Sequence, residues 1–428
     1  MSKYQAYSEY KDTGIDWLPK VPTCWHVLPL KLVLMNKVKD GPHETPVFIE
    51  DGIPFLSVDG IQDGKLVFEG CRYISQEDHE RYAKKCLPKY GDILLGKAAS
   101  VGKVAFVDTE QEFNVWSPLA VLTPKSVKYG KFLYYSLQST WLQAQCDVSS
   151  NSNTQKNLSM GVIDNLSFPI PVDSVAEKIA SFLDHETAKI DTLIDKQQQL
   201  IQLLKEKRQA VISHAVTKGL NPNAPMRDSG VEWLGEVPEH WILARLKNVL
   251  RIRNGRDYKD VEVEDGGYPV YGSGGIFKRS SNYLYDGKSV LFGRKGTIDK
   301  PLVVSGKFWT VDTMFYSEVF DNALPEYIYY QAIFFPFSLL STNTALPSMT
   351  QEDLLMLPFV IPPNKEQESI VRHVQDKTAK FDYLINKAQS AIEFMQERRT
   401  ALISAAVTGK IDVRSWVAPS TLSGNIRE

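Results

Sequence analysis

The chain has 428 residues, of which 43% are hydrophobic and 23% charged, so it is long enough to bury a core in two or three domains. Its formal net charge of −2 argues against a uniformly basic nucleic-acid-binding protein, so any DNA contact would depend on local basic patches. It contains no run of about 18 apolar residues and no apolar signal near its N-terminus, so we expect a cytoplasmic protein that does not span a membrane.

An internal repeat is the strongest feature of the sequence. The motif DTGIDWLPKVPTCW at residues 12–25 returns as DSGVEWLGEVPEHW at residues 228–241, 216 positions later. A second block, residues 188–217, returns at residues 379–408, 191 positions later. The two halves therefore share repeated ends, and the segment between these ends is 25 residues shorter in the second half.

The first insert lies between Trp25 and Phe168 and has a mixed strand, loop and helix pattern. Within it, GDILLGKAASVGKVAFV at residues 91–107 predicts an apolar strand, a small basic loop and a second apolar strand. On this loop, Lys97 and Lys103 could meet a DNA phosphate or a guanine edge, although a solvated turn explains each of them equally well. The four cysteines of the chain have no CxxC spacing and no histidine pair beside them, so we expect free thiols and no zinc site.

The first long helix is predicted from Glu177 to about residue 216, where proline and glycine are absent and apolar residues fall at helical, partly heptad spacing. Pro171 precedes this segment and Gly219 follows it, as expected at the ends of a helix. About 40 residues would form a rod of roughly 60 Å. A lone amphipathic helix is usually a packing surface. Two copies could instead pair antiparallel and hold the inserts as dimeric DNA-binding proteins hold two half-sites.

The second insert lies between Trp241 and Phe359 and opens with a dense basic stretch. Its candidate DNA-binding residues are Arg251, Arg253, Arg256 and Lys259. The spacing of two between the first two arginines indicates one face of a strand. Farther along, KSVLFGRKGTIDKPLVV at residues 288–304 matches the hairpin of the first insert, with the cations Arg294, Lys295 and Lys300. A shift of 197 places Gly96 on Gly293, Lys97 on Arg294, and Lys103 on Lys300.

The glycine-rich string at residues 268–275 fits neither the dinucleotide fingerprint nor a phosphate-binding P-loop. The second long helix follows Pro362 and Pro363 and is expected to end near Gly409. We find no Walker motif, nucleophile elbow, HExxH motif, nuclease cluster or adenine-methyltransferase motif. We therefore expect no catalytic residues, no metal ligands and no cofactor site in this chain.

Taken together, the duplicated motif, the helices closing in RQAVISHAVTKG and RTALISAAVTGK, and the unlike inserts resemble the specificity subunit of type I restriction-modification enzymes over nearly the whole chain. The resemblance implies an α+β fold in which two mixed α/β target recognition domains are separated by two long antiparallel coiled-coil helices with a pseudo-two-fold internal repeat. It also implies a division of the chain into five parts. These are two recognition domains at residues 1–172 and 219–363, two spacer helices at residues 173–218 and 364–410, and a tail at residues 411–428.

The same resemblance implies a non-catalytic subunit that recognises a bipartite site on double-stranded DNA and directs adenine methylation and restriction by its partners. Those partners would be two modification subunits that use S-adenosylmethionine and two restriction subunits that use ATP and Mg. The main alternative is a duplicated coiled-coil scaffold whose inserts bind proteins or glycans, for which affinity would not fall steeply with salt. A hidden hydrolase is a second alternative, and the missing motifs count against it.

Overall fold

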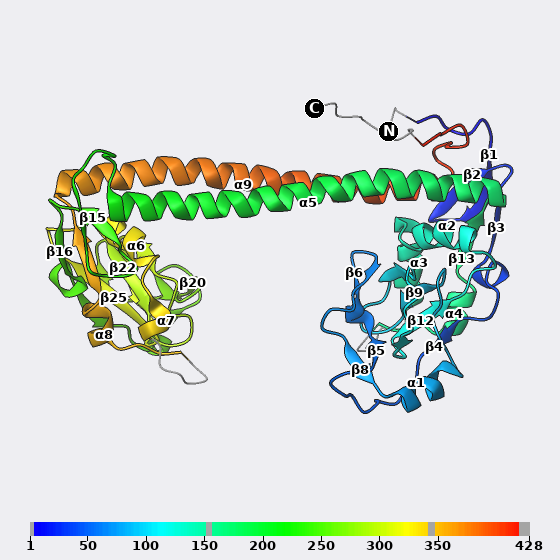
Figure 1. Ribbon diagram of the computed structural model, residues 1–428, viewed down its shortest axis with the longest axis horizontal. Coiled ribbons are helices and arrows are strands. Elements are labelled where there is room, and N and C mark those ends of the chain that lie inside the picture. The colour runs from blue at the N-terminus through cyan, green and yellow to red at the C-terminus, as the bar shows by residue number, and fades with distance from the viewer. Residues whose placement is uncertain (1–3, 151–155, 341–346, 419–428) are drawn as a thin grey trace. The chain divides into compact units, whose positions relative to one another are not determined.

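The computed structural model describes residues 4–150, 156–340 and 347–418 (Figure 1). It divides into two compact units, one formed by residues 1–197 with 390–428 and the other by residues 198–389. Both long helices, α5 (Asp173–Lys218) and α9 (Asn364–Val407), contribute residues to each unit. Of the predicted tail, residues 419–428 lie outside the described part of the chain.

The first unit is built from short strands and helices that precede α5. In chain order they are β1 (Tyr10–Ile15), β2 (Leu18–Pro22), β3 (His26–Pro29), β4 (Lys39–Asp40), β5 (Ile53–Leu56), β6 (Ile61–Gln62), β7 (Lys65–Leu66), β8 (Arg72–Ile74), α1 (Gln76–Ala83), β9 (Ile93–Gly96), β10 (Val104–Phe106), β11 (Asn114–Val115), β12 (Leu119–Leu122), α2 (Val127–Leu137), α3 (Thr140–Ser149), α4 (Met160–Asp164) and β13 (Ser167–Ile170).

Two sheets form the insert of the first unit. One is antiparallel with the strand order β10-β9-β12-β4, and the other has the order β11-β5-β8, with β11 parallel to β5. Helices α2 and α3 lie between the first sheet and α5 (Figure 1), and their apolar residues share one core with both long helices. The insert is therefore packed directly against the repeated helical segments.

The second unit repeats this plan. In chain order it contains β14 (Met226–Asp228), β15 (Glu236–Pro238), β16 (Ile242–Arg245), β17 (Leu250–Asn254), β18 (Glu262–Val263), β19 (Tyr268–Gly272), β20 (Gly275–Ser280), β21 (Tyr285–Asp286), β22 (Ser289–Gly293), β23 (Leu302–Val304), β24 (Lys307–Thr310), β25 (Met314–Val319), α6 (Pro325–Ala332), α7 (Phe337–Leu340), α8 (Gln351–Leu355) and β26 (Pro358–Ile361), followed by α9.

The two inserts have the same topology. The sheet β23-β22-β25-β17 matches β10-β9-β12-β4, and the parallel pair of β19 with β24 matches that of β5 with β11. The connections diverge, because residues 57–71 link β5 to β8 whereas only residues 273–274 link β19 to β20. This accounts for part of the difference in length between the halves and confirms the predicted repeat of two mixed α/β domains.

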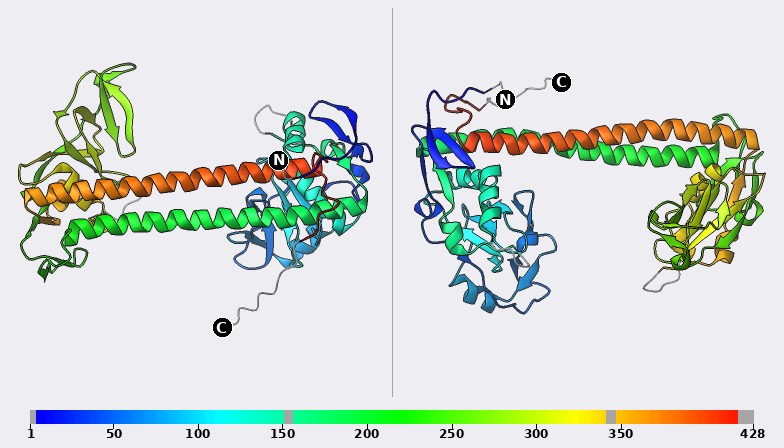
Figure 2. Two further views of the ribbon diagram at one scale, coloured as in Figure 1. Left: turned by 90° about the horizontal axis from the view of Figure 1, so that it is seen from above. Right: turned by 180° about the vertical axis from the view of Figure 1, so that it is seen from behind.

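Within each unit, α5 and α9 run side by side and antiparallel (Figures 1 and 2). In the first unit, Nε of Arg399 lies 2.9 Å from Oδ1 of Asp191. In the second unit, Nε of Arg208 lies 3.1 Å from Oδ1 of Asp382. Because the sequence repeat maps Asp191 onto Asp382 and Arg208 onto Arg399, these are two copies of one ion pair. The predicted antiparallel helices are confirmed within each unit, and the internal repeat extends to their ion pair.

The repeated Trp-containing motif packs against the end of a long helix in each unit. Gly409 follows α9 at φ 71°, and a Cβ there would come within 2.4 Å of Pro22. Gly219 follows α5 at φ 76°, and a Cβ there would come within 3.1 Å of the Trp241 ring. Left-handed glycine therefore ends each helix and leaves room for the motif. Trp25 and Trp241 are each 1% exposed, which explains why the motif is duplicated together with the helices.

None of the helices among the described residues is long and apolar enough to cross a membrane. All four cysteines are free thiols, as predicted, and burial raises the pKa of the Cys86 thiol to about 11. No group of three or more His, Cys, Asp or Glu side chains in the described residues could hold a metal ion.

Candidate nucleic-acid interface

Both predicted hairpins are present. Strands β9 and β10 pair antiparallel around a loop at residues 97–103, and β22 and β23 pair around residues 294–301. The loops fold back closely, because a Cβ on Gly96 would meet the Ser100 carbonyl oxygen at 2.4 Å and one on Gly293 would meet that of Thr297 at 2.1 Å. Glycine is therefore required at both places, and the sequence alignment of the two hairpins is confirmed.

The sequence predicted an accessible side chain for Lys97, but the structure buries it. It is 8% exposed, and its Nζ lies 3.2 Å from Oδ2 of Asp40, which is itself 1% exposed. Lys85 reaches the other oxygen, Oδ1, at 2.7 Å. Burial raises the pKa of the Asp40 carboxyl, but the hydrogen bonds and charges of the two lysines outweigh burial and hold that pKa below its usual value. This arrangement argues against direct DNA contact by Lys97 and for a role in holding the loop.

The other cation of this loop, Lys103, is exposed, and its Nζ donates a hydrogen bond of 3.1 Å to the Ile61 carbonyl oxygen. Beside it, Ala99 and Ser100 line a pocket of about 420 Å³ together with Arg72 and Trp116. The sequence did not single out these last two side chains. A cation and an aromatic ring beside a polar loop form a surface that can contact bases or phosphates.

The loop of the second insert is more open than that of the first. Arg294 is half-buried, donates from Nη1 to the Asp312 carbonyl oxygen at 3.3 Å, and lies 6.0 Å from the centre of the Phe315 ring. Lys295 and Lys300 are exposed. None of the three cations forms an ion pair with another residue in the described part of the chain. These side chains remain candidates for contact with DNA.

The predicted basic strand is β17, and its two arginines point to one exposed face. Both meet Glu318, which receives two hydrogen bonds from Arg253 at 2.9 and 3.2 Å and lies 3.8 Å from Arg251. Part of their positive charge is therefore neutralised within the protein. Arg256 and Lys259 follow on an exposed segment and have no ion pair with a described residue.

A cluster of lysines in the first unit was missed by the sequence analysis. The side chains surround a pocket of about 410 Å³, which also contains Tyr90 and Asp92. We call it the lysine pocket; its four lysines are Lys37, Lys39, Lys89 and Lys125. Aligning β4 with β17 would have revealed two of them, because Lys37 and Lys39 repeat the spacing of two seen for Arg251 and Arg253.

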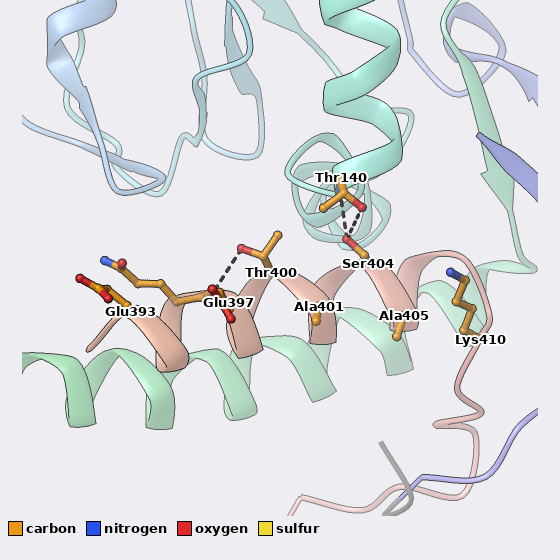
Figure 3. A pocket seen from close by; sticks show the side chains of 9 residues that line it. Thr140, Glu393, Glu397, Thr400, Ala401, Ser404, Ala405 and Lys410 are labelled. Carbon is orange, nitrogen blue, oxygen red and sulfur yellow. Dashed lines mark hydrogen bonds between the residues drawn. The ribbon is translucent and has the colours of Figure 1, made fainter. Parts of the chain in front are cut away.

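A different hollow lies where α3 approaches α9 (Figure 3). Ser404 accepts a hydrogen bond of 3.0 Å from the Thr140 backbone N–H, which joins the two helices. Glu393 and Glu397 outnumber the single lining cation, Lys410, so this hollow is a poor site for a phosphate. No histidine or cysteine lines it.

Comparisons with known proteins agree with this geometry. The family model "Type I restriction modification DNA specificity domain" matches twice, at residues 48–203 and 238–393. The EcoKI specificity subunit of Escherichia coli K12 is 22% identical, with 95% of this chain and 93% of that protein covered. The MjaVIII specificity subunit of Methanocaldococcus jannaschii is also 22% identical, with 92% of this chain and 95% of that protein covered.

Solved structures share the fold. A chain from a study of assembly of the type I R-M system superimposes with a TM-score of 0.65 at 14% identity, covering 91% of this chain and 99% of that one. The HsdS subunit of Thermoanaerobacter tengcongensis gives a TM-score of 0.50, also at 14% identity, covering 91% and 98%. The two matches to the family model span well over half of the sequence, one on each insert. This chain therefore belongs to the type I restriction-modification DNA specificity family.

Proposed function

We propose that this chain is the sequence-specificity subunit of a type I restriction-modification enzyme and that each insert recognises one half of a bipartite DNA site. The observation that carries this proposal is the repeated topology combined with unlike surfaces. The two inserts share one sheet order, yet their cations are placed and neutralised differently. Two recognition modules of one fold with different surfaces suit two different half-sites.

We further propose the division of labour that the sequence predicted. Residues 1–172 and 219–363 would serve as target recognition domains, and residues 173–218 and 364–410 as the spacer that fixes the gap between half-sites. The helices support this role because each continues without a break through residues of both units. A continuous helix resists bending more than a loop of the same length does.

The partners in this proposal are double-stranded DNA, two modification subunits and two restriction subunits. The modification subunits would methylate adenine with S-adenosylmethionine, and the restriction subunits would use ATP and Mg, so this chain would need no cofactor of its own. Its role would be to place the methyltransferase over the target base. A protein that acts on chromosomal DNA works where that DNA is, so we propose a cytoplasmic location.

A selection experiment tests this function against a coiled-coil scaffold with protein- or glycan-binding inserts. The full chain, in complex with its candidate modification subunit, is incubated with a pool of random duplexes, and the bound fraction is sequenced at several salt concentrations. We expect two short specified blocks separated by a fixed unspecified gap, and an affinity that falls steeply as salt rises. Absence of any enriched sequence, with binding indifferent to salt, would support the scaffold.

A further inference from the structure

The lysine pocket gathers four lysines around one acid. Lys37, Lys39, Lys89 and Lys125 are all exposed, and none forms an ion pair with a residue in the described ranges. The acid in the pocket, Asp92, is 4% exposed, and it accepts a hydrogen bond of 2.9 Å from the Lys89 backbone N–H. Burial raises the pKa of the Asp92 carboxyl, and this single carboxyl stands against four ammonium groups.

The second insert has basic side chains at matching positions, and there an acidic side chain neutralises them. Leu119 pairs with Gly96, and Met314 pairs with the matching glycine, Gly293. Thr123 and Glu318 each lie four residues farther along, so they occupy matching positions in the two inserts. Lys39 lies opposite Val121, and Arg253 lies opposite Tyr316. These two partners each lie two residues beyond Leu119 and Met314, so Lys39 matches Arg253.

The two inserts therefore place their acid differently. The second insert places the Glu318 carboxylate beside its two cations, at 2.9 Å from Arg253 and 3.8 Å from Arg251. The first insert places Thr123 there, which carries no charge, and its acid is instead the buried Asp92, at the position of Ser289 in the second insert. Four ammonium groups around one pocket repel each other, and a bound anion lowers this repulsion. The pocket therefore favours a ligand that carries negative charge.

We infer that the lysine pocket binds backbone phosphates of duplex DNA beside the half-site recognised by the first insert. This inference rests on the proposed function and adds the surface that supplies sequence-independent affinity. Lysine ammoniums suit this role because phosphate contacts position the protein without specifying bases. The exposed ring of Tyr90 at the rim adds a hydrogen-bond donor for the sugar-phosphate backbone.

The test compares K37Q/K39Q with K128Q/K189Q, which removes the same charge from the same unit. The control lysines are already paired, Lys128 with Glu177 at 3.4 Å and Lys189 with Glu186 at 3.1 Å. Each variant is assembled with the candidate modification subunit, and the dissociation constant for a duplex carrying the selected motif is measured from about 50 to 200 mM salt. Thermal unfolding checks that both variants are folded.

Each phosphate contact contributes about 0.9 to the slope of log affinity against log salt. If Lys37 and Lys39 each meet one phosphate, K37Q/K39Q should flatten the slope by about 2. Between the lowest and the highest salt, the fold-loss of affinity should then be roughly ten times smaller for K37Q/K39Q than for wild type. The slope for K128Q/K189Q should stay within about 0.5 of wild type. The selected motif should be the same for all three proteins.

An unchanged slope for K37Q/K39Q would overturn the inference. So would normal DNA binding combined with lost assembly in size-exclusion chromatography, because the pocket would then bind an acidic segment of a partner protein. If wild type itself selects no split motif, the proposed function fails instead, so the two failures are distinguishable.

Discussion

The buried pair of Lys97 and Asp40 makes a quantitative prediction about the first hairpin loop. Replacing Lys97 by Met leaves Asp40, which is 1% exposed, with Lys85 at 2.7 Å from Oδ1 and His43 at 3.2 Å from Oδ2 as its remaining partners. Removing one partner of a buried ion pair costs about 3–5 kcal/mol, and Lys85 and His43 offset part of this cost. We therefore expect K97M to destabilise the first unit by about 2–4 kcal/mol, which lowers its Tm by roughly 5–15 °C.

Two further variants separate this cause from others. In the matched strand of the second insert, Asn254 occupies the place of Asp40, so D40N/K97M should recover at least half of the lost stability. Arg294 occupies the place of Lys97 but is half-buried, and it has no ion pair among the described residues. R294M should therefore cost less than about 1 kcal/mol.

Scanning calorimetry of the full chain measures these shifts, and DNA binding of the same samples completes the comparison. Charge reversal at Arg294 should weaken binding by about 1–3 kcal/mol if its guanidinium contacts a base in a bidentate manner, and by less if it meets a phosphate. A Tm for K97M within about 2 °C of wild type would refute the structural role assigned to Lys97.

Three other predictions follow from the same structure. Exchanging residues 26–167 for the insert of a relative should change one half-site of the methylated motif and leave the other intact, whereas a change in both halves would refute two independent inserts. Inserting four residues near Gln197–Gln199 lengthens α5 by about 6 Å and should widen the gap between half-sites by about one or two base pairs without altering either sequence; an unchanged gap would refute the spacer role. Because the pKa of Asp40 is lowered on folding, its contribution to stability is complete above about pH 4 and is lost as the pH falls through its folded value. The Tm of D40N should therefore fall less than that of wild type between pH 6 and 3, and parallel curves would contradict this.

The sequence predicted features that depend on local pattern or repetition. The two long helices follow from apolar spacing without proline or glycine, and the structure places them at Asp173–Lys218 and Asn364–Val407. The two hairpins could be aligned by Gly96 and Gly293. At each of these glycines the backbone of the following loop comes too close to leave room for a side chain.

Pairing between distant charges could not be predicted in this way. Asp40 lies 57 positions before Lys97. The two residues come together because β4, which carries Asp40, and β9, which precedes Lys97, both lie next to β12 in the sheet. Glu318 lies 65 positions after Arg253, so the sequence did not show that an acidic side chain neutralises part of this basic stretch. For the same reason, the sequence could not show that Lys37, Lys39, Lys89 and Lys125 have no ion pair within the described ranges.

Genome-wide adenine methylation in cells that express this chain with its candidate modification subunit tests the central claim most directly, with the modification subunit alone as control. We predict a split motif that is methylated only when this chain is present, which would also give both half-sites and the gap between them. No new methylated motif, despite assembly of the complex, would contradict the specificity role and favour the scaffold.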